Sequence, residues 1–96
     1  MKRAELLFSN EIVLEDERLM KLDYCLTESY PEEEGSEPYY GIRITKYLGG
    51  DVETDEVCGI SYSKDTVIDM LRKLFRFEVT PVSMVEIIDD LITLGD

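Results

Sequence analysis

Apolar and polar residues alternate along the first two-thirds of the chain, and the remainder follows a helical period. The clearest alternation runs from Arg18 to Ser29. One face of this segment is apolar and holds Met20, Leu22, Tyr24 and Leu26. The other face holds Lys21, Asp23, Cys25 and Thr27. A period of two is typical of a strand with one buried face, so a half-buried strand is predicted here.

Three further segments are predicted as strands. The segment from Ala4 to Leu14 alternates imperfectly, and Ser9-Asn10 is expected to bulge, bend or divide it. The other two run from Tyr39 to Leu48 and from about Val52 to Ser61. In the segment that begins at Tyr39, the inward side chains are Tyr40, Ile42 and Ile44. Its outward side chains include Arg43, Thr45 and Tyr47.

The last two strands are joined at Gly49-Gly50, and two registers are possible. A tight two-residue turn gives the charge pairs Arg43–Glu56 and Lys46–Glu53 but sets Ile44 opposite Asp55. A longer loop gives the pairs Ile42–Ile60, Ile44–Cys58, Lys46–Glu56 and Tyr40–Tyr62. Exposed ion pairs contribute only about 0.2–1 kcal/mol each, whereas a buried face fixes register strongly. The longer loop is therefore predicted.

A helix is predicted after Ser63, which is a suitable N-cap, with Asp65 in the first turn. Its apolar stripe consists of Val67, Ile68, Leu71, Leu74 and Phe75. Asp69 precedes Arg72 and Lys73 at spacings that allow surface ion pairs. Val79-Thr80-Pro81 is expected to stop this helix because proline cannot continue it.

A second helix has two possible starts. Either Thr80 caps it with Pro81 at the first helical position, or Ser83 caps it in a capping box with Glu86. Its apolar positions are Met84, Val85, Ile87, Ile88, Leu91, Ile92 and Leu94. This stripe is wider than packing on one sheet face requires, and Gly95 is expected to end the helix.

Together these elements predict one α+β domain over residues 1–96. Its architecture is two-layer, a four-stranded and mainly antiparallel meander covered by two C-terminal helices. Residues 31–38 contain four glutamates, two prolines and a glycine, so a mobile acidic loop is expected there.

Charge and missing residue types exclude several functions. The 96 residues include 22 Asp+Glu against 10 Lys+Arg, a net charge of −12, which argues against binding nucleic acid or an anionic membrane directly. The absence of histidine removes the commonest general base and zinc ligand, and no phosphate-binding glycine loop occurs. No metal or cofactor is therefore expected. The two cysteines, Cys25 and Cys58, are expected to be reduced, half-buried thiols in a cytoplasmic protein.

Three stretches carry a family resemblance: Tyr40-Gly41-Ile42-Arg43-Ile44, Val79-Thr80-Pro81-Val82, and Asp89-Asp90. Together they resemble a family of short, uncharacterised bacterial proteins of unknown function. The resemblance implies a small cytoplasmic bacterial domain and supplies no functional residue.

Two groups of side chains are candidates for an interaction surface. The first is Tyr39, Arg43 and Tyr47, because tyrosine and arginine concentrate at binding hot spots, although ordinary cross-strand packing explains them as well. The second is the basic cluster of Arg72, Lys73 and Arg76, which also suits a solvated helix C-terminus.

Carboxylate groups offer two further candidates. Asp51, Glu53 and Asp55 are spaced like the opening of a calcium loop, but Glu56 stands where that loop needs glycine, so a solvated strand edge is favoured. Glu86, Asp89 and Asp90 could serve a divalent ion, but adjacent helical residues point about 100° apart.

The function favoured by these observations is a non-catalytic protein-interaction or regulatory module, with homodimer formation through the second helix or a strand edge as one form of it. Two alternatives stay open. One is an acidic inhibitor that mimics nucleic acid, and the other is an enzyme that uses carboxylates and a divalent metal.

Overall fold

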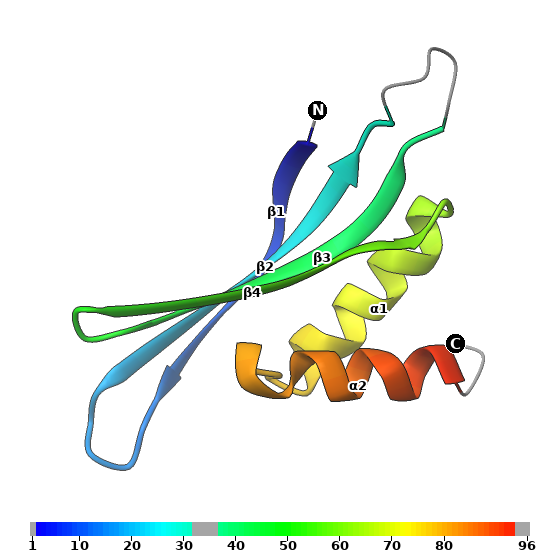
Figure 1. The fold of residues 1–96 in the computed structure, drawn as a ribbon. Helices are drawn as coiled ribbons and strands as arrows, with labels where there is room; N and C mark the ends of the chain where they lie inside the picture. Colours follow the sequence, from blue (N-terminus) through cyan, green and yellow to red (C-terminus); the bar gives the residue numbers. More distant parts are fainter. Residues whose placement is uncertain (1, 32–36, 94–96) are drawn as a thin grey trace.

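The computed structural model describes residues 2–31 and 37–93. Four strands come first, β1 (Lys2–Val13), β2 (Leu19–Ser29), β3 (Tyr39–Leu48) and β4 (Asp51–Ser61). Two helices follow, α1 (Lys64–Arg76) and α2 (Pro81–Thr93). The strands form one antiparallel sheet in the order β1-β2-β3-β4, and both helices lie on the same side of it (Figure 1). The predicted two-layer α+β meander is confirmed.

The core lies between the helices and the inner face of the sheet, which is the face turned toward them. Its buried apolar side chains are Leu22, Tyr24, Leu26, Ile42, Ile44, Val67, Met70, Leu71, Leu74, Val79, Met84 and Ile88. The alternation predicted for β2 and β3 is confirmed by this set. Tyr24 is fully buried, its hydroxyl donates to the Val79 carbonyl at 3.0 Å, and burial raises its pKa to about 12.

Strand β1 is continuous, and its irregularity lies earlier than predicted. The register shifts by one residue between Leu6 and Phe8, whereas Asn10 pairs regularly with Leu22. The bulge turns Phe8 to the inner face, where its ring stacks on Phe75 at 5.0 Å. Asn10 stays in the strand because its side-chain amide donates to the Phe75 carbonyl at 2.9 Å, near the end of α1.

The register predicted for the β3–β4 hairpin is wrong. A tight turn at Gly49-Gly50 pairs Arg43 with Glu56, and it sets Ile44 opposite Asp55. Gly49 has a φ of 60°, which suits such a turn. Asp55 stays exposed although Ile44 is fully buried, so the carboxylate keeps its hydration and the pairing carries no desolvation cost.

A second register shift occurs farther along this hairpin, between Tyr40 and Ile42. Ile42 pairs with Val57 and Tyr40 pairs with Ser61, so β4 contains extra residues around Gly59, whose φ is 66°. The longer-loop register placed Tyr40 opposite Tyr62, one residue away from the pairing found here. A one-residue difference exchanges the two faces of a strand, so the longer-loop register is wrong in this half of the hairpin as well.

Helix α1 starts as predicted and ends before the predicted stop. The Ser63 hydroxyl accepts from the Thr66 amide at 3.3 Å. At the other end, Glu78 has a φ of 54°, its amide donates to the Phe75 carbonyl, and the Val79 amide donates to the Leu74 carbonyl. This is a Schellman motif, and it ends the helix before Pro81 is reached.

Helix α2 begins at Pro81, so the predicted start with Pro81 at the first helical position is the one observed, and Ser83 lies inside the helix. Leu94 and Gly95, where this helix was expected to end, lie outside the described residues, as do residues 32–36 of the predicted acidic loop.

The helices are much shorter than the sheet they cover. Each has 13 residues and spans about 20 Å, whereas strands of this kind rise about 3.4 Å per residue. At 12 and 11 residues, β1 and β2 extend for roughly 40 Å. Both hairpin ends of the sheet consequently project beyond the helices (Figure 1).

Candidate functional site

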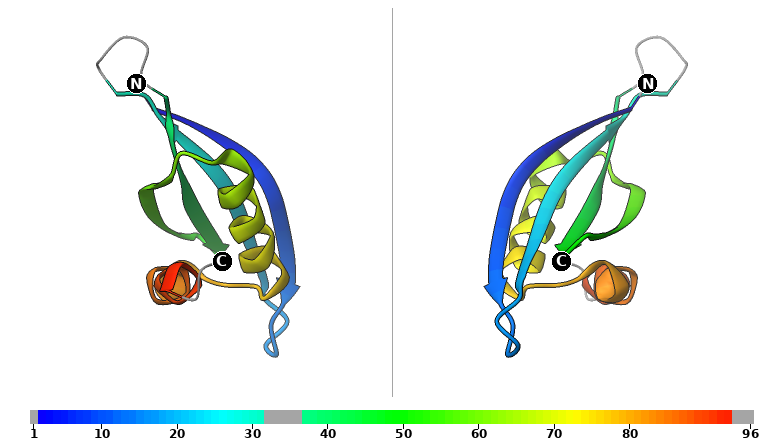
Figure 2. Two further views of the ribbon diagram at one scale, coloured as in Figure 1. Left: turned by 90° about the vertical axis from the view of Figure 1, so that its right-hand side faces the viewer. Right: turned by 90° about the vertical axis from the view of Figure 1, so that its left-hand side faces the viewer.

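The face of the sheet opposite the helices, called the outer face here, carries no second layer among the described residues (Figure 2). Strand alternation puts Tyr39, Arg43 and Tyr47 on this face, as predicted, because Ile42 and Ile44 between them point into the core. Tyr39 and Tyr47 are exposed, while Arg43 is half-buried. The three side chains occupy one column of β3 but have different neighbours.

Arg43 lies in a charge cluster that spans the sheet. Its guanidinium contacts the Glu56 carboxylate at 3.2 Å, and the same carboxylate accepts from the Lys2 ammonium of β1. The Lys2 hydrogen bond and the Arg43 charge hold the pKa of Glu56 below its ordinary value. Arg43 thus ties β3 to β4 through Glu56, and the three groups together keep one net positive charge.

The two cysteines differ in their surroundings. Cys25 is half-buried next to Arg43, and burial, with the Asp23 charge adding to it, raises its thiol pKa. Cys58 is exposed, so the prediction of two half-buried thiols is wrong for this residue. It is exposed because it lies in the irregular part of β4, outside the regular pairing with β3. Both cysteines are free.

Tyr39 and Tyr47 contact different partners at opposite ends of β3. The Tyr39 ring stacks on Tyr62 with 3.9 Å between centroids, and the hydrogen bond with Tyr39 raises the pKa of Tyr62. The Lys21 ammonium lies 5.7 Å from the Tyr47 ring centroid, a cation–π distance. The three candidates of β3 therefore do not form one site, and each belongs to a different local contact.

Four exposed apolar side chains, one of them Tyr47, stand at the hairpin ends of the outer face. Val13 pairs with Leu19, and Tyr47 pairs with Val52, so all four strands contribute one residue. Their exposed fractions are 70%, 52%, 39% and 60% in that order. Val13, Leu19, Tyr47 and Val52 are called the hairpin patch below.

Sequence reasoning missed three members of the hairpin patch. The bulge between Leu6 and Phe8 inverts the phase of β1, so the facing of Val13 could not be set from alternation. Leu19 and Val52 stand at strand ends, where polar turn residues conceal the pattern. The available signal was the Tyr47–Val52 pairing, which follows from a tight Gly49-Gly50 turn.

The basic cluster of α1 lies on the helix side of the molecule, away from the outer face. Arg72, Lys73 and Arg76 line a groove of about 320 Å³ together with Thr66, Asp69 and Met70. The Arg72 guanidinium contacts Asp69 at 2.9 Å, which confirms the predicted pair three residues apart. Two of the three cations lie in the last turn of α1, where a positive charge interacts favourably with the helix dipole.

The carboxylate candidates are dispersed. Glu86, Asp89 and Asp90 are exposed on α2, and Asp51, Glu53 and Asp55 are exposed along β4. Within residues 2–31 and 37–93, no group of three or more Cys, Asp or Glu side chains is arranged to hold a metal ion. The carboxylate–metal alternative therefore has no assembled site to build on in this part of the chain.

The wide apolar stripe of α2 is covered on one side only. Met84 and Ile88 are buried against the sheet, whereas Val82, Val85 and Ile92 are 80%, 43% and 51% exposed. Val82, Val85 and Ile92 are called the α2 stripe below. Among the described residues, no helix is long and apolar enough to cross a membrane.

These features define an acidic two-layer α+β protein with one open sheet face. Within that class, the chain belongs to DUF6514, a family of unknown function, which matches residues 3–94. The resemblance to a family without an assigned function is thereby confirmed, and the bacterial origin of its members stays a prediction. No match was found among the curated proteins or among the solved structures.

Proposed function

We propose that this protein is a non-catalytic interaction module that binds a protein partner through the outer face of its sheet. The observation that carries the proposal is the hairpin patch, in which four strands each place an exposed apolar side chain on a face without a covering layer. An exposed apolar cluster with an aromatic member is typical of a protein-binding surface.

The surroundings of the patch support a protein partner. Glu11 and Lys21 are exposed and pair with each other on the same face, and Lys21 also pairs with Tyr47, so polar groups lie directly beside the apolar side chains. Protein interfaces combine apolar and polar groups in this way. The Tyr47 ring, backed by Lys21, provides a rigid anchor at low conformational entropy.

A homodimer through the α2 stripe is the second candidate, favoured by the exposure of Val82, Val85 and Ile92. For both the partner-binding module and the homodimer we infer a reducing, cytoplasmic location, which is supported by the two free cysteines.

The experiment is capture from a lysate of the source cells at low and high salt. Three proteins are compared: the wild type, the patch variant Leu19→Thr/Val52→Thr, and the control variant Val82→Ala/Val85→Ala on α2. Threonine keeps strand propensity and alanine keeps helix propensity, so both variants are expected to fold, as far-UV circular dichroism would verify.

The expected result is one protein retained at both salts by the wild type and the α2 variant and lost by the patch variant. Equal retention by the patch variant would overturn the proposal, and so would an empty capture. Retention at low salt alone would instead favour the nucleic-acid mimic, because exposed electrostatic contacts are screened by salt. Light scattering on the same samples tests the homodimer, whose mass should fall to that of a monomer in the α2 variant.

A further inference from the structure

The outer face carries no net charge, although the chain as a whole is strongly acidic. Alternation and register place six charged side chains on this face: Lys2, Glu11, Lys21, Asp23, Arg43 and Glu56. Three are basic and three are acidic, so their formal charges cancel. The net charge of −12 therefore belongs to the rest of the protein, and a second copy of the chain meets less repulsion at the outer face than elsewhere.

The six side chains form two groups of opposite sign. The group near the hairpin patch, called the acidic pole here, consists of Glu11, Lys21 and Asp23. Glu11 pairs with Lys21, whose ammonium lies 3.8 Å from the Asp23 carboxylate. With two carboxylates and one ammonium, the acidic pole keeps one net negative charge.

The second group, called the basic pole here, lies farther from the hairpin patch. It consists of Lys2, Arg43 and Glu56, which keep one net positive charge. Leu6 and Tyr39 stand in this half of the outer face and are 53% and 37% exposed. Each half of the face thus combines exposed apolar side chains with one unit of net charge, and the two halves have opposite signs.

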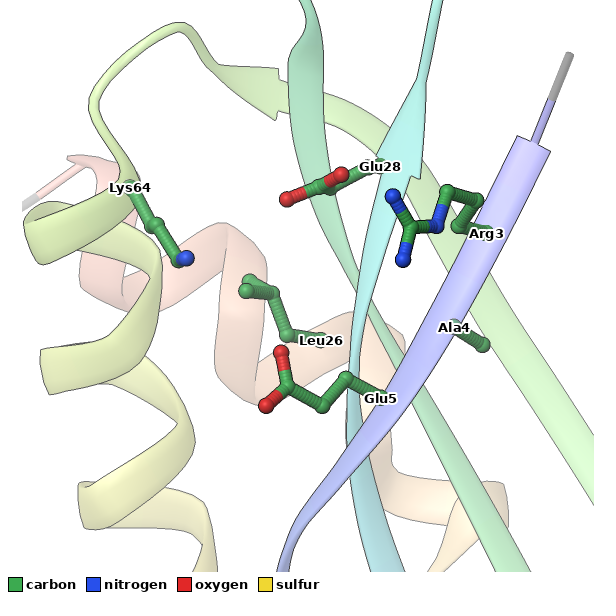
Figure 3. Close-up of a pocket in the computed structure, with 6 residues that line it drawn as sticks. All are labelled: Arg3, Ala4, Glu5, Leu26, Glu28 and Lys64. Atoms are coloured by element: carbon green, nitrogen blue, oxygen red, sulfur yellow. The ribbon is translucent and has the colours of Figure 1, made fainter.

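Charges of both signs also meet on the inner face, but they are not separated there. A pocket of about 370 Å³ is lined by Arg3, Ala4, Glu5, Leu26, Glu28 and Lys64. Figure 3 shows its cations and carboxylates alternating around Leu26, which is only 1% exposed. This pocket therefore has neither separate poles nor an accessible apolar centre, whereas the outer face has both poles and exposed apolar side chains.

The size of the outer face suits a protein interface. Four strands of 10 to 12 residues that lie about 4.8 Å apart form a face of roughly 650 Å² in projection. Each partner in a standard protein interface buries about 800 Å² of accessible surface, and the accessible surface of a face is larger than its projection. The outer face is therefore large enough to form one side of such an interface.

We propose that the outer face binds a second copy of this chain, an inference that rests on the proposed function because it names the partner of the same face. The two faces pack together about a two-fold axis that lies between them and runs across the strands. This axis reverses the strand direction, so the acidic pole of each copy lies against the basic pole of the other. The hairpin patch of each copy covers the half that holds Leu6 and Tyr39, and the helices of both copies stay on the outside (Figure 2). Because each pole meets its opposite, the face is complementary to itself.

The α2 stripe is a poorer surface for a second copy. Helix α2 carries the exposed side chains Glu86, Asp89 and Asp90 and contains no basic residue. A two-fold contact along α2 would bring two sets of these carboxylates together, and like charges that face each other oppose association. The outer face avoids this repulsion, so the dimer is expected there.

Sedimentation equilibrium of the full 96-residue chain measures the dimer. The wild type is expected to form dimers within the range up to millimolar protein. The patch variant Leu19→Thr/Val52→Thr is expected to dimerise about tenfold or more weakly, because it removes apolar area twice across the two-fold axis. The α2 variant Val82→Ala/Val85→Ala should dimerise as the wild type does. The protein retained in the capture experiment is then expected to be the chain itself.

Two charge variants test the poles. Glu11→Lys turns the acidic pole positive and Lys2→Glu turns the basic pole negative, so each variant sets like charges against each other. Each is expected to dimerise about tenfold more weakly than the wild type. The double variant Lys2→Glu/Glu11→Lys exchanges the poles and should restore the dimer, as should an equal mixture of the two single variants. Both residues are exposed, so the variants are expected to fold, which far-UV circular dichroism verifies.

Three outcomes would overturn the inference: a monomeric wild type, a dimer that dissociates in the α2 variant but not in the patch variant, or a double variant no tighter than the single ones. Opposite effects of the two single variants would also overturn it, because they would report the total charge of the chain rather than the poles. A monomeric wild type leaves the proposed function standing if the capture experiment retains a different protein through the hairpin patch.

Discussion

The two faces of the sheet are built from the same strands and differ in how far their apolar side chains are buried. On the inner face, Leu22, Ile42 and Ile44 are fully buried under the helices. On the outer face, Leu6, Leu19 and Val52 are more than half exposed although they stand in the same sheet. Alternation at a period of two makes this separation possible, because neighbouring residues point to opposite sides.

The difference separates the face that stabilises the fold from the face proposed to bind a partner. Burial of apolar side chains on the inner face supplies most of the free energy of folding, at roughly 25 cal/mol for each Å² removed from water. The outer face contributes mainly cross-strand pairs, and each of these is worth about 0.2–1 kcal/mol. Most substitutions on the outer face are therefore expected to leave the protein folded, as the proposed interaction module requires.

The largest expected effect comes from removing a core side chain. Leu22→Ala is expected to lower the free energy of unfolding by about 2–5 kcal/mol, because it leaves a cavity under the helices. Leu6→Ala on the neighbouring strand should change it by less than about 0.5 kcal/mol, since Leu6 is 53% exposed. Urea unfolding of both variants checks the contrast, and equal losses would mean that the outer face is also part of the core.

The second effect is a loss of stability at alkaline pH that originates on the inner face. Tyr24 has its pKa raised from 10.0 to about 12, so the folded state keeps the proton that the unfolded chain releases. Its stabilising contribution is complete below pH 10 and is lost as the pH rises toward 12, by up to about 2–3 kcal/mol.

The test is to measure the free energy of unfolding of the wild type and of Tyr24→Phe between pH 9 and pH 12. The variant lacks the titrating hydroxyl and its bond to Val79, so it is less stable at neutral pH. Its stability should fall less steeply than that of the wild type above pH 10, and parallel curves would contradict the assignment.

The third effect is an exception to the tolerance of the outer face. A Cβ atom at Gly41 would lie 2.7 Å from the Thr27 hydroxyl, 2.9 Å from Cys58 Cα and closer still to the Val57 carbonyl. Gly41→Ala is therefore expected to cost about 1–3 kcal/mol through overpacking against the β4 bulge. Gly50→Ala meets no atom within 4 Å and should be neutral within about 0.5 kcal/mol. Thermal unfolding of the two variants measures the difference, and equal melting temperatures for Gly41→Ala and Gly50→Ala would contradict this explanation.

The fold was predictable because its strongest signals are local. The alternation of β2, the cap at Ser63 and the start at Pro81 each depend on a few adjacent residues. The end of α1 was not predictable, since Glu78 adopts the left-handed conformation that usually indicates glycine.

The register of the β3–β4 hairpin was missed because it depends on whether side chains of the edge strand β4 are covered by other elements. Asp55 is tolerated opposite Ile44 only because the carboxylate stays in water, and no residue near it in sequence reports that. The pocket and the hairpin patch depend on the same kind of long-range information. Arg3, Glu28 and Lys64 are brought together by register and by the placement of α1, both of which are tertiary properties.

The smallest expected effect concerns the charge cluster of the outer face. Glu56 accepts from Lys2 and contacts Arg43, and these cations lower its pKa. A lowered pKa stabilises the fold above the unfolded value of 4.5, and this contribution is lost as the pH falls through the lowered folded value. Glu56→Gln should therefore lower the free energy of unfolding by about 1 kcal/mol or less at neutral pH and by progressively less below pH 4.5.

The matched control is Glu53→Gln. The Glu53 side chain is 52% exposed and contacts Lys46 at 3.7 Å, so a smaller change is expected. Urea unfolding at neutral and acidic pH measures both, and a Glu56→Gln deficit that persisted at acidic pH would show that packing, not charge, holds β1, β3 and β4 together here.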